Sequence, residues 1–188
     1  MRHKEALKIL KKGTVIPATP LALTSERKFD EKRQRLLTRY YLEAGAGGIA
    51  TAVHSTQFEI REPSVNLFET VLASVGGEIS KYEEDTGRTV VRIAGVCGRE
   101  EQAVCEAQTA KNYGYDAVLL SPGGLSDMSE DELLERTRSV SKVMPTILFY
   151  LQKAVGGRQF SYSYWERACE IEGVAAIKCA SFNRYSTI

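Results

Sequence analysis

One lysine near the C-terminus stands where its amine could do chemistry. Lys178 closes the short apolar run 174–178. If this run is a strand of a parallel sheet, its carboxyl end is where functional side chains project. Partial desolvation there would lower the pKa of the lysine and leave a neutral amine able to attack a ketone carbon. The alternative is a lysine that only marks the exit of a strand into solvent.

A tyrosine closes the apolar run that precedes this one. Tyr150 ends the run 146–150, and Lys178 ends the next. Neighbouring strands lie about 4.8 Å apart, so two side chains at their ends can meet over one substrate. A phenol both donates and accepts hydrogen bonds, which suits proton transfer. The alternative is a core tyrosine whose hydroxyl bonds to the backbone.

Six short apolar runs recur along the chain, with helical stretches between them. Such runs are typical of strands that are covered on both faces. Pro17 weakens the first run, because proline has no N–H for a strand ladder. The predicted strands are residues 14–19, 48–53, 89–94, 117–120, 146–150 and 174–178.

The helical stretches have readable ends. Asp30 is a candidate N-cap, and Ser129 with Glu132 matches a capping box. The predicted helices are residues 30–42, 67–82, 99–113, one that opens after residue 129, and 162–171, with a further amphipathic helix at the N-terminus. Strict alternation of strands and helices predicts right-handed crossovers and a parallel sheet. Two architectures fit, a doubly wound open sheet and a (β/α)8 barrel, and the lack of G-x-G-x-x-G after the first run counts against a dinucleotide fold.

Composition excludes several classes of protein. The chain has 188 residues, of which 43% are hydrophobic and 26% charged, with a net charge of +1. These values predict one globular domain over residues 1–188 and give no field that would recruit nucleic acid or an anionic membrane. No stretch approaches the about 18 apolar residues of a membrane span, and the basic N-terminus lacks the apolar part of a secretory signal.

The cysteines and histidines form no recognisable metal site. No C-x-x-C pair occurs, and His3 and His54 are the only histidines. We therefore expect no metal and no cofactor. The four cysteines are expected to be buried thiols of a cytoplasmic protein: Cys97, Cys105, Cys169 and Cys179.

Several blocks in order resemble the dihydrodipicolinate synthase and N-acetylneuraminate lyase family, whose members are (β/α)8 barrels that use a Schiff-base lysine. The blocks are GTVIPATPLALT, GAGGIATAVHST, SPGGLSDMSEDELLERTRSVSKVMPTILFY and GVAAIKCASFN. The last is similar to the family's G-I-K-x-S-S-G-D strand, which implies that Lys178 forms an imine with pyruvate or another α-keto acid. The third includes the family's "ILYN" strand, and the resemblance implies that Tyr150 shuttles protons.

The resemblance also implies substrate-binding residues. Ser55 and Thr56, with His54 before them, stand in place of the family's G-T-T-G-E loop and would hold the keto acid carboxylate or relay protons. Arg158 or Lys153 would take the place of the arginine in N-V-P-x-R-T-G. A polar surface loop and a flexible loop cation are the alternative interpretations.

Two departures from the family's pattern narrow the choice of substrate. The synthases carry a tyrosine pair after their fourth strand, whereas residues 121–125 contain no tyrosine. The arginine after the fifth strand is shifted as well. The sequence thus favours another aldolase or dehydratase that acts on a keto acid over the synthase of lysine biosynthesis.

The chain is short for a complete barrel, which needs about 250 residues. We expect about six βα units of an incomplete (β/α)8 barrel. A fragment of a longer protein is favoured over a naturally shortened member or one completed by a second copy in a homo-oligomer. With half of the cavity wall missing, we expect weak or no turnover by these 188 residues alone.

Three functions remain open. The first is a class I aldolase-type lyase or synthase that takes a small α-keto acid. The second is a non-catalytic remnant that binds or assembles with a partner through its open edges. The third, a phosphate-binding barrel enzyme, ranks low because such sites use the seventh and eighth loops.

Overall fold

The structure is a computed structural model that describes residues 2–180, 182, 183 and 185. The chain divides into two compact units, one of Met1–Gly95 with Asn112–Asp116 and one of Val96–Lys111 with Ala117–Ile188. Each unit is described by itself.

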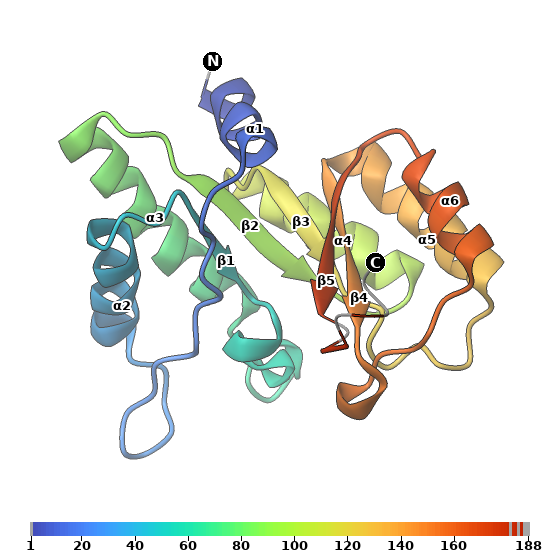
Figure 1. Cartoon of the computed structure of the whole chain (residues 1–188). Helices are drawn as coiled ribbons and strands as arrows, with labels where there is room; N and C mark the ends of the chain where they lie inside the picture. The colour runs from blue at the N-terminus through green and yellow to red at the C-terminus, as the bar shows by residue number, and fades with distance from the viewer. Residues whose placement is uncertain (1, 181, 184, 186–188) are drawn as a thin grey trace. The chain divides into compact units, whose positions relative to one another are not determined.

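The first unit pairs two parallel strands with helices. Gly48 pairs with Val91 and Thr51 with Ala94, which gives a parallel register. Figure 1 shows α2 and α3 side by side next to β1. The elements of this unit are α1 (Arg2–Lys12), α2 (Glu31–Glu43), β1 (Gly48–Thr51), two short 3-10 helices (His54–Thr56 and Phe58–Arg61), α3 (Phe68–Thr86) and β2 (Val91–Val96), whose last residue belongs to the second unit.

An apolar cluster fills the space between these helices and strands. Ile49 of β1, Leu42 of α2 and Val75 of α3 are fully buried within it. Asp30 begins α2 as expected, because its side chain accepts a hydrogen bond from the N–H of Arg33. The predicted start of this helix is therefore confirmed.

The first predicted strand is wrong as a regular strand. Residues 14–19 run beside β1 and form only an isolated parallel bridge, between Ala18 and Ala50. The N–H of Thr19 donates to the carbonyl of Ala50, and the N–H of Ala50 donates to the carbonyl of Pro17. Because Pro17 has no N–H, the segment lacks the hydrogen bond that residue 17 would donate to β1, although the N–H groups of Gly47 and Gly48 both donate to the carbonyl of Val15.

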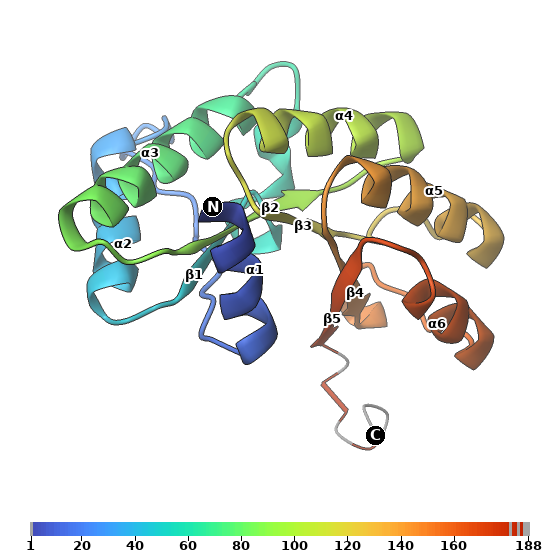
Figure 2. The same cartoon turned by 90° about the horizontal axis from the view of Figure 1, so that it is seen from above.

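The second unit contains three parallel strands in chain order. β3 pairs with β4, and β4 pairs with β5. Ser129 forms the expected capping box with Glu132 at the start of α5. Figure 2 shows α5 and α6 together on one side of β4 and β5. The elements are α4 (Glu100–Asn112), β3 (Ala117–Leu120), α5 (Glu130–Val143), β4 (Thr146–Leu151), a 3-10 helix (Lys153–Val155), α6 (Tyr162–Cys169) and β5 (Val174–Ala180).

The expected burial of the cysteines is wrong. Cys97 is partly exposed, and Cys105, Cys169 and Cys179 are exposed. The helical cysteines lie on the solvent side of α4 and α6, while Cys179 lies on β5, which has exposed or half-buried residues throughout. Apolar sequence neighbours therefore did not imply a buried thiol.

Candidate active site

Lys178 lies in the carboxyl half of β5, as its position in the sequence predicts. The register pairs Lys178 with Phe149 on β4. Paired residues of parallel strands project from the same face, and the lysine Nζ lies 4.6 Å from the centroid of the Phe149 ring. The amine therefore stands over an aromatic ring.

The surroundings of Lys178 favour the neutral amine. Desolvation lowers the pKa of Lys178, although its side chain is exposed along the edge of β5. Within the part of the chain that the structure describes, no carboxylate forms an ion pair with this lysine that would offset the desolvation. A lysine with a lowered pKa is a better nucleophile near neutral pH than an ordinary one.

The expectation that Tyr150 meets Lys178 is corrected by the register. Tyr150 pairs with Cys179, so its side chain projects from the face opposite to that of Lys178. There its ring meets Trp165 of α6 edge-on, with the centroids 5.6 Å apart. The alternation of a strand places residues 149 and 150 on opposite faces, and the pairing of β4 with β5 decides which of them faces the lysine.

The sequence interpretation missed Phe149 and Ser121. The alternation of side chains along β4 already placed residues 149 and 150 on opposite faces. The register with β5 was needed to decide which of them faces Lys178. Leu120 pairs with Leu148 in the last pair between β3 and β4, and Ser121 is the residue that follows β3. Phe149 and Lys178 are a register pair on β4 and β5.

Arg136 holds the loops at this carboxyl edge. Its Nε donates to the carbonyl of Gly98 over 2.8 Å, and its Nη2 donates to the carbonyl of Ser121 over 3.0 Å. The side chain belongs to α5 and is almost fully buried. Burial lowers the pKa of Arg136 to about 10, which leaves the guanidinium charged at neutral pH. Arg136 thus fixes the backbone that carries Ser121.

Arg158 lies near Tyr150 in a small hollow at the end of β4. Both residues line this hollow of about 210 Å³ together with Lys153. The Arg158 guanidinium donates to the carbonyl of Met128 and lies 5.4 Å from the centroid of the Phe160 ring. The structure thus brings Tyr150 and Arg158 together in one hollow at the end of β4.

The loop after β1 carries the other predicted binding residues. Thr56 is fully buried, and its hydroxyl donates to the carbonyl of Thr19 over 2.7 Å. Ser55 and His54 are exposed, and the His54 ring stacks on Phe58 with the centroids 5.5 Å apart. These residues belong to the first unit, whereas Lys178 belongs to the second. The Thr56 hydroxyl already donates its proton to the Thr19 carbonyl, so Ser55 and His54 are the two of these three predicted residues that a ligand can reach.

The backbone of this loop is strained at both ends. Ala52 and Gln57 have φ angles of 59° and 74°, in the left-handed region that non-glycine residues rarely adopt. Gly95 approaches Ala52 so closely that a Cβ on it would lie 2.3 Å from the Ala52 carbonyl oxygen. Such strain is frequent at functional loops and needs tight packing to persist.

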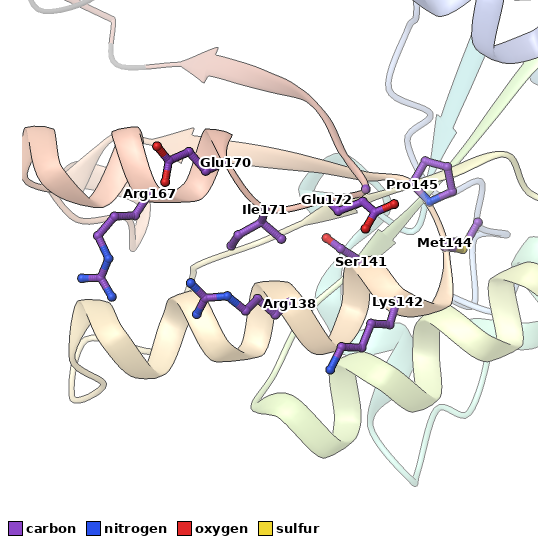
Figure 3. Close-up of a pocket in the computed structure, with 10 residues that line it drawn as sticks. Arg138, Ser141, Lys142, Met144, Pro145, Arg167, Glu170, Ile171 and Glu172 are labelled. Carbon is purple, nitrogen blue, oxygen red and sulfur yellow. The ribbon is translucent and has the colours of Figure 1, made fainter.

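A larger hollow lies at the other end of the strands. Its volume is about 720 Å³, and Pro145 and Gly173, which line it, directly precede β4 and β5. Figure 3 shows its walls formed by α5, α6 and the turns that lead into these strands. Catalytic residues of barrel enzymes gather at the carboxyl ends instead. The size of a hollow alone therefore does not identify the active site in this chain.

Two properties of the described residues bear on other functions. No three histidine, cysteine, aspartate or glutamate side chains among residues 2–180, 182, 183 and 185 are grouped so that they could hold a metal ion. In the same part of the chain, no helix has both the length and the apolar character needed to cross a membrane.

Comparison with known proteins rests on structure. No protein-family model matches the sequence, and no curated protein matches it significantly. A dihydrodipicolinate synthase from Bacillus anthracis superposes with a TM-score of 0.78 at 19% identity, over 93% of this chain and 57% of that chain. An N-acetylneuraminate lyase from Mycoplasma synoviae gives 0.75 at 18% identity, again over 93% and 57%.

The chain has the fold of the dihydrodipicolinate synthases and N-acetylneuraminate lyases. A third structure with this synthase–lyase fold, a dihydrodipicolinate synthase from Acinetobacter baumannii complexed with pyruvate, gives a TM-score of 0.73 at 20% identity, over 88% of this chain and 54% of that chain. The present chain spans about 57% of the length of the first of these structures. The expected fold class, an incomplete barrel of alternating strands and helices, is confirmed.

The synthase–lyase fold also decides between the two architectures that the sequence left open. Within each unit, strands that follow one another in the chain are hydrogen-bonded neighbours. A doubly wound sheet reverses its strand order at a switch point, whereas a barrel does not. Five strands are described instead of six, because residues 14–19 form only a bridge.

Proposed function

We propose that the protein is a class I aldolase-type lyase or synthase whose Lys178 forms an imine with an α-keto acid. The observation that carries this proposal is the Lys178 amine at the carboxyl end of β5, with a lowered pKa and no ionic partner among the described residues. The synthase–lyase fold and the pyruvate complex of the Acinetobacter baumannii synthase support the choice of ligand.

The reaction needs a neutral amine and a carbonyl carbon. The lone pair of Nζ attacks the ketone carbon of the keto acid, and one proton passes from the nitrogen to the oxygen to give a neutral carbinolamine. A second proton, taken up from solvent, lets the hydroxyl leave as water and leaves a protonated imine, which withdraws electrons from the neighbouring carbon. That carbon can then lose a proton, attack an acceptor or release a cleaved bond, which covers aldol condensation, aldol cleavage and dehydration.

The other residues are assigned more narrowly. Ser55 and His54 are proposed to contact substrate, because they are exposed in a strained loop. Arg158 is proposed to attract the carboxylate of a substrate from the end of β4. Tyr150 is not assigned the proton relay, because its side chain shares the face of Trp165.

Trapping the imine tests the proposal directly. The purified chain is incubated with pyruvate and sodium borohydride, and the reduced adduct is located by peptide mass spectrometry. We expect one adduct, on Lys178, which disappears in Lys178→Met and persists in the control Lys142→Met. Lys142 is a suitable control because it is exposed and belongs to the same unit. Folded protein by circular dichroism without any adduct would exclude the imine.

A second candidate is an assembly partner without catalysis. Among the described strands, β5 pairs only with β4, so its other edge presents free backbone N–H and C=O groups. Such an edge can take up a strand from another chain. The trapping experiment separates the two functions, because an edge-binding remnant has no need of a nucleophilic lysine.

A further inference from the structure

We propose that a hollow at the amino end of β2 binds the phosphate group of a small phosphorylated metabolite. The hollow has a volume of about 520 Å³, which is within the range of small-molecule sites, and its lining includes Arg2, Arg88 and Arg92. All of its lining residues belong to the first unit, whereas Lys178 belongs to the second. The inference is therefore independent of the proposed imine chemistry.

Arg92 is a buried arginine that keeps hydrogen-bond donors unused. Its side chain is 8% exposed, and its Nη2 pairs with Glu83. Its Nε is buried and has no hydrogen-bond partner among the described residues. Its Nη1 lies 3.8 Å from the point at which Gly114 would carry a Cβ, so the glycine leaves room beside this nitrogen. Because buried polar groups normally have their partners, the unused donors point to an acceptor that occupies the hollow.

Arg88 provides a second set of donors. Its Nη1 donates to the hydroxyl of Tyr82 over 2.7 Å, and its Nη2 donates to the carbonyl of Ala46 over 3.4 Å. These bonds hold an exposed guanidinium at the wall of the hollow, where it has no carboxylate partner among the described residues. A guanidinium has more N–H donors than these two bonds use, so Arg88 keeps donors for an anion.

The charges beside the hollow leave one cation without compensation. Glu83 pairs with Arg2 and Arg92, and Asp116 pairs with Arg2. The guanidinium groups of Arg2, Arg88 and Arg92 thus outnumber these two carboxylates by one. A guanidinium binds phosphate and carboxylate oxygens through charge-assisted hydrogen bonds, so the excess charge favours an anionic ligand.

A phosphate group suits these donors better than a carboxylate does. The three arginines come from three parts of the first unit, since Arg2 belongs to α1, Arg88 to the loop before β2 and Arg92 to β2 itself. A phosphate ester offers acceptor oxygens in three directions and nearly two negative charges, whereas a carboxylate offers two coplanar oxygens and one charge. The hydroxyls of Ser80 and Thr89, which also line the hollow, can donate further hydrogen bonds.

The position of the hollow indicates binding without catalysis. Catalytic residues of barrel enzymes gather at the carboxyl ends of the strands, whereas residues 87–92 lead into the amino end of β2. Arg2 connects α1 to the same hollow, so a ligand that contacts Arg2 also strengthens the attachment of this helix. We therefore expect a ligand that stabilises the first unit and is released unchanged.

The test compares three small molecules with similar hydroxylated bodies. Binding of sn-glycerol 3-phosphate, glycerate and glycerol to the whole chain is measured by isothermal titration calorimetry at constant ionic strength. We expect glycerol 3-phosphate to bind about tenfold more tightly than glycerate, the factor that one further charge-assisted hydrogen bond gives, and glycerol not to bind. No binding of glycerol 3-phosphate would overturn the site, and an equal affinity for glycerate would overturn the assignment to phosphate.

Variants that each remove one charge locate the bound anion. Arg88→Gln changes an exposed residue and should weaken the binding of glycerol 3-phosphate about tenfold. Arg92→Gln should weaken it at least as much, and if this variant does not fold, Arg88→Gln decides alone. Lys81→Gln is the matched control, because Lys81 is exposed on α3 and lies outside the lining of the hollow.

The control separates a built site from general attraction between charges. We expect Lys81→Gln to change the affinity by less than about twofold, and Glu84→Gln, which removes a carboxylate from the wall of the hollow, to raise it. Equal losses in Arg88→Gln and Lys81→Gln would overturn the site. Circular dichroism of each variant shows that a lost affinity does not come from a lost fold.

Discussion

Lys178 and Phe149 face each other across β4 and β5, with the lysine Nζ 4.6 Å from the centroid of the phenyl ring. Two effects oppose each other at this contact. The ring face attracts the charged ammonium, whereas desolvation disfavours it. Desolvation lowers the pKa of Lys178. The pair therefore holds a positioned amine that loses its proton more readily than a lysine in water.

The first prediction concerns the pH dependence of imine formation. Only the neutral amine attacks a ketone, so the trapping rate rises as Lys178 loses its proton. Because desolvation lowers its pKa, the half-maximal rate with pyruvate should occur at a lower pH than for Nα-acetyl-lysine. The measurement is the rate of borohydride trapping between neutral and alkaline pH. A midpoint equal to that of the free amino acid would show that the site does not activate the lysine.

A second prediction exchanges the two aromatic positions of β4. Phe149→Tyr places a phenol on the face of Lys178, where it can donate the proton that removes water from the carbinolamine. We expect this variant to accelerate adduct formation by about tenfold, below the usual range for a well-placed general acid. Tyr150→Phe removes a hydroxyl from the opposite face and should change the rate by less than about twofold. A large loss of the rate of adduct formation in Tyr150→Phe would show that Tyr150 does relay protons.

The third prediction concerns acid stability of the first unit. Partial burial pushes the pKa of Glu83 upward, but hydrogen bonds from Arg2 and from the N–H of Val90, with the charges of Arg2 and Arg92, outweigh it and lower the pKa. A carboxylate with a lowered pKa stabilises the fold above its unfolded value of 4.5. This contribution is lost as the pH falls below 4.5 and through the lowered folded pKa.

Replacing Glu83 tests this contribution. Glu83→Gln should lower the free energy of unfolding at pH 7 by about 2 kcal/mol, the range for hydrogen bonds to charged groups. The difference from the unchanged chain should shrink as the pH falls below 4.5. Glu84→Gln is the matched control, because Glu84 is the exposed neighbour on the same helix. Urea denaturation over a series of pH values measures both, and a difference that stays constant down to pH 2 would contradict the assignment.

The fourth prediction concerns Arg136. Arg136→Met removes the donors to the carbonyls of Gly98 and Ser121 and leaves these oxygens without their partner. We expect a loss of about 2–4 kcal/mol in the free energy of unfolding, since each buried unsatisfied group costs about 1–3 kcal/mol. Arg138→Met, on the same helix, removes an ion pair with the exposed Glu135 and should cost less than about 1 kcal/mol. Equal losses would show that Arg136 has no special role.

The sequence alone determined the order and kind of the elements. Apolar runs of four to six residues became β1 to β5, because short continuous apolar runs are typical of the strands of a parallel sheet. Asp30 and Ser129 marked helix starts, because an N-cap side chain bonds to a backbone N–H only three residues away. Lys178 could also be identified from the sequence, because the end of an apolar run is a local feature. Residues 14–19 were misread, because their apolar character was local but their pairing was not.

Only the tertiary structure decided which side chains meet. The sequence placed Tyr150 and Phe149 one residue apart and could not say which of them faces Lys178. The pairing of β4 with β5 chose Phe149, and a shift of one residue would have chosen Tyr150. The exposure of Cys179 and the burial of Thr56 likewise depend on residues distant in the chain. Local patterns therefore specify elements, whereas the register between strands, which depends on packing across the whole sheet, specifies the site.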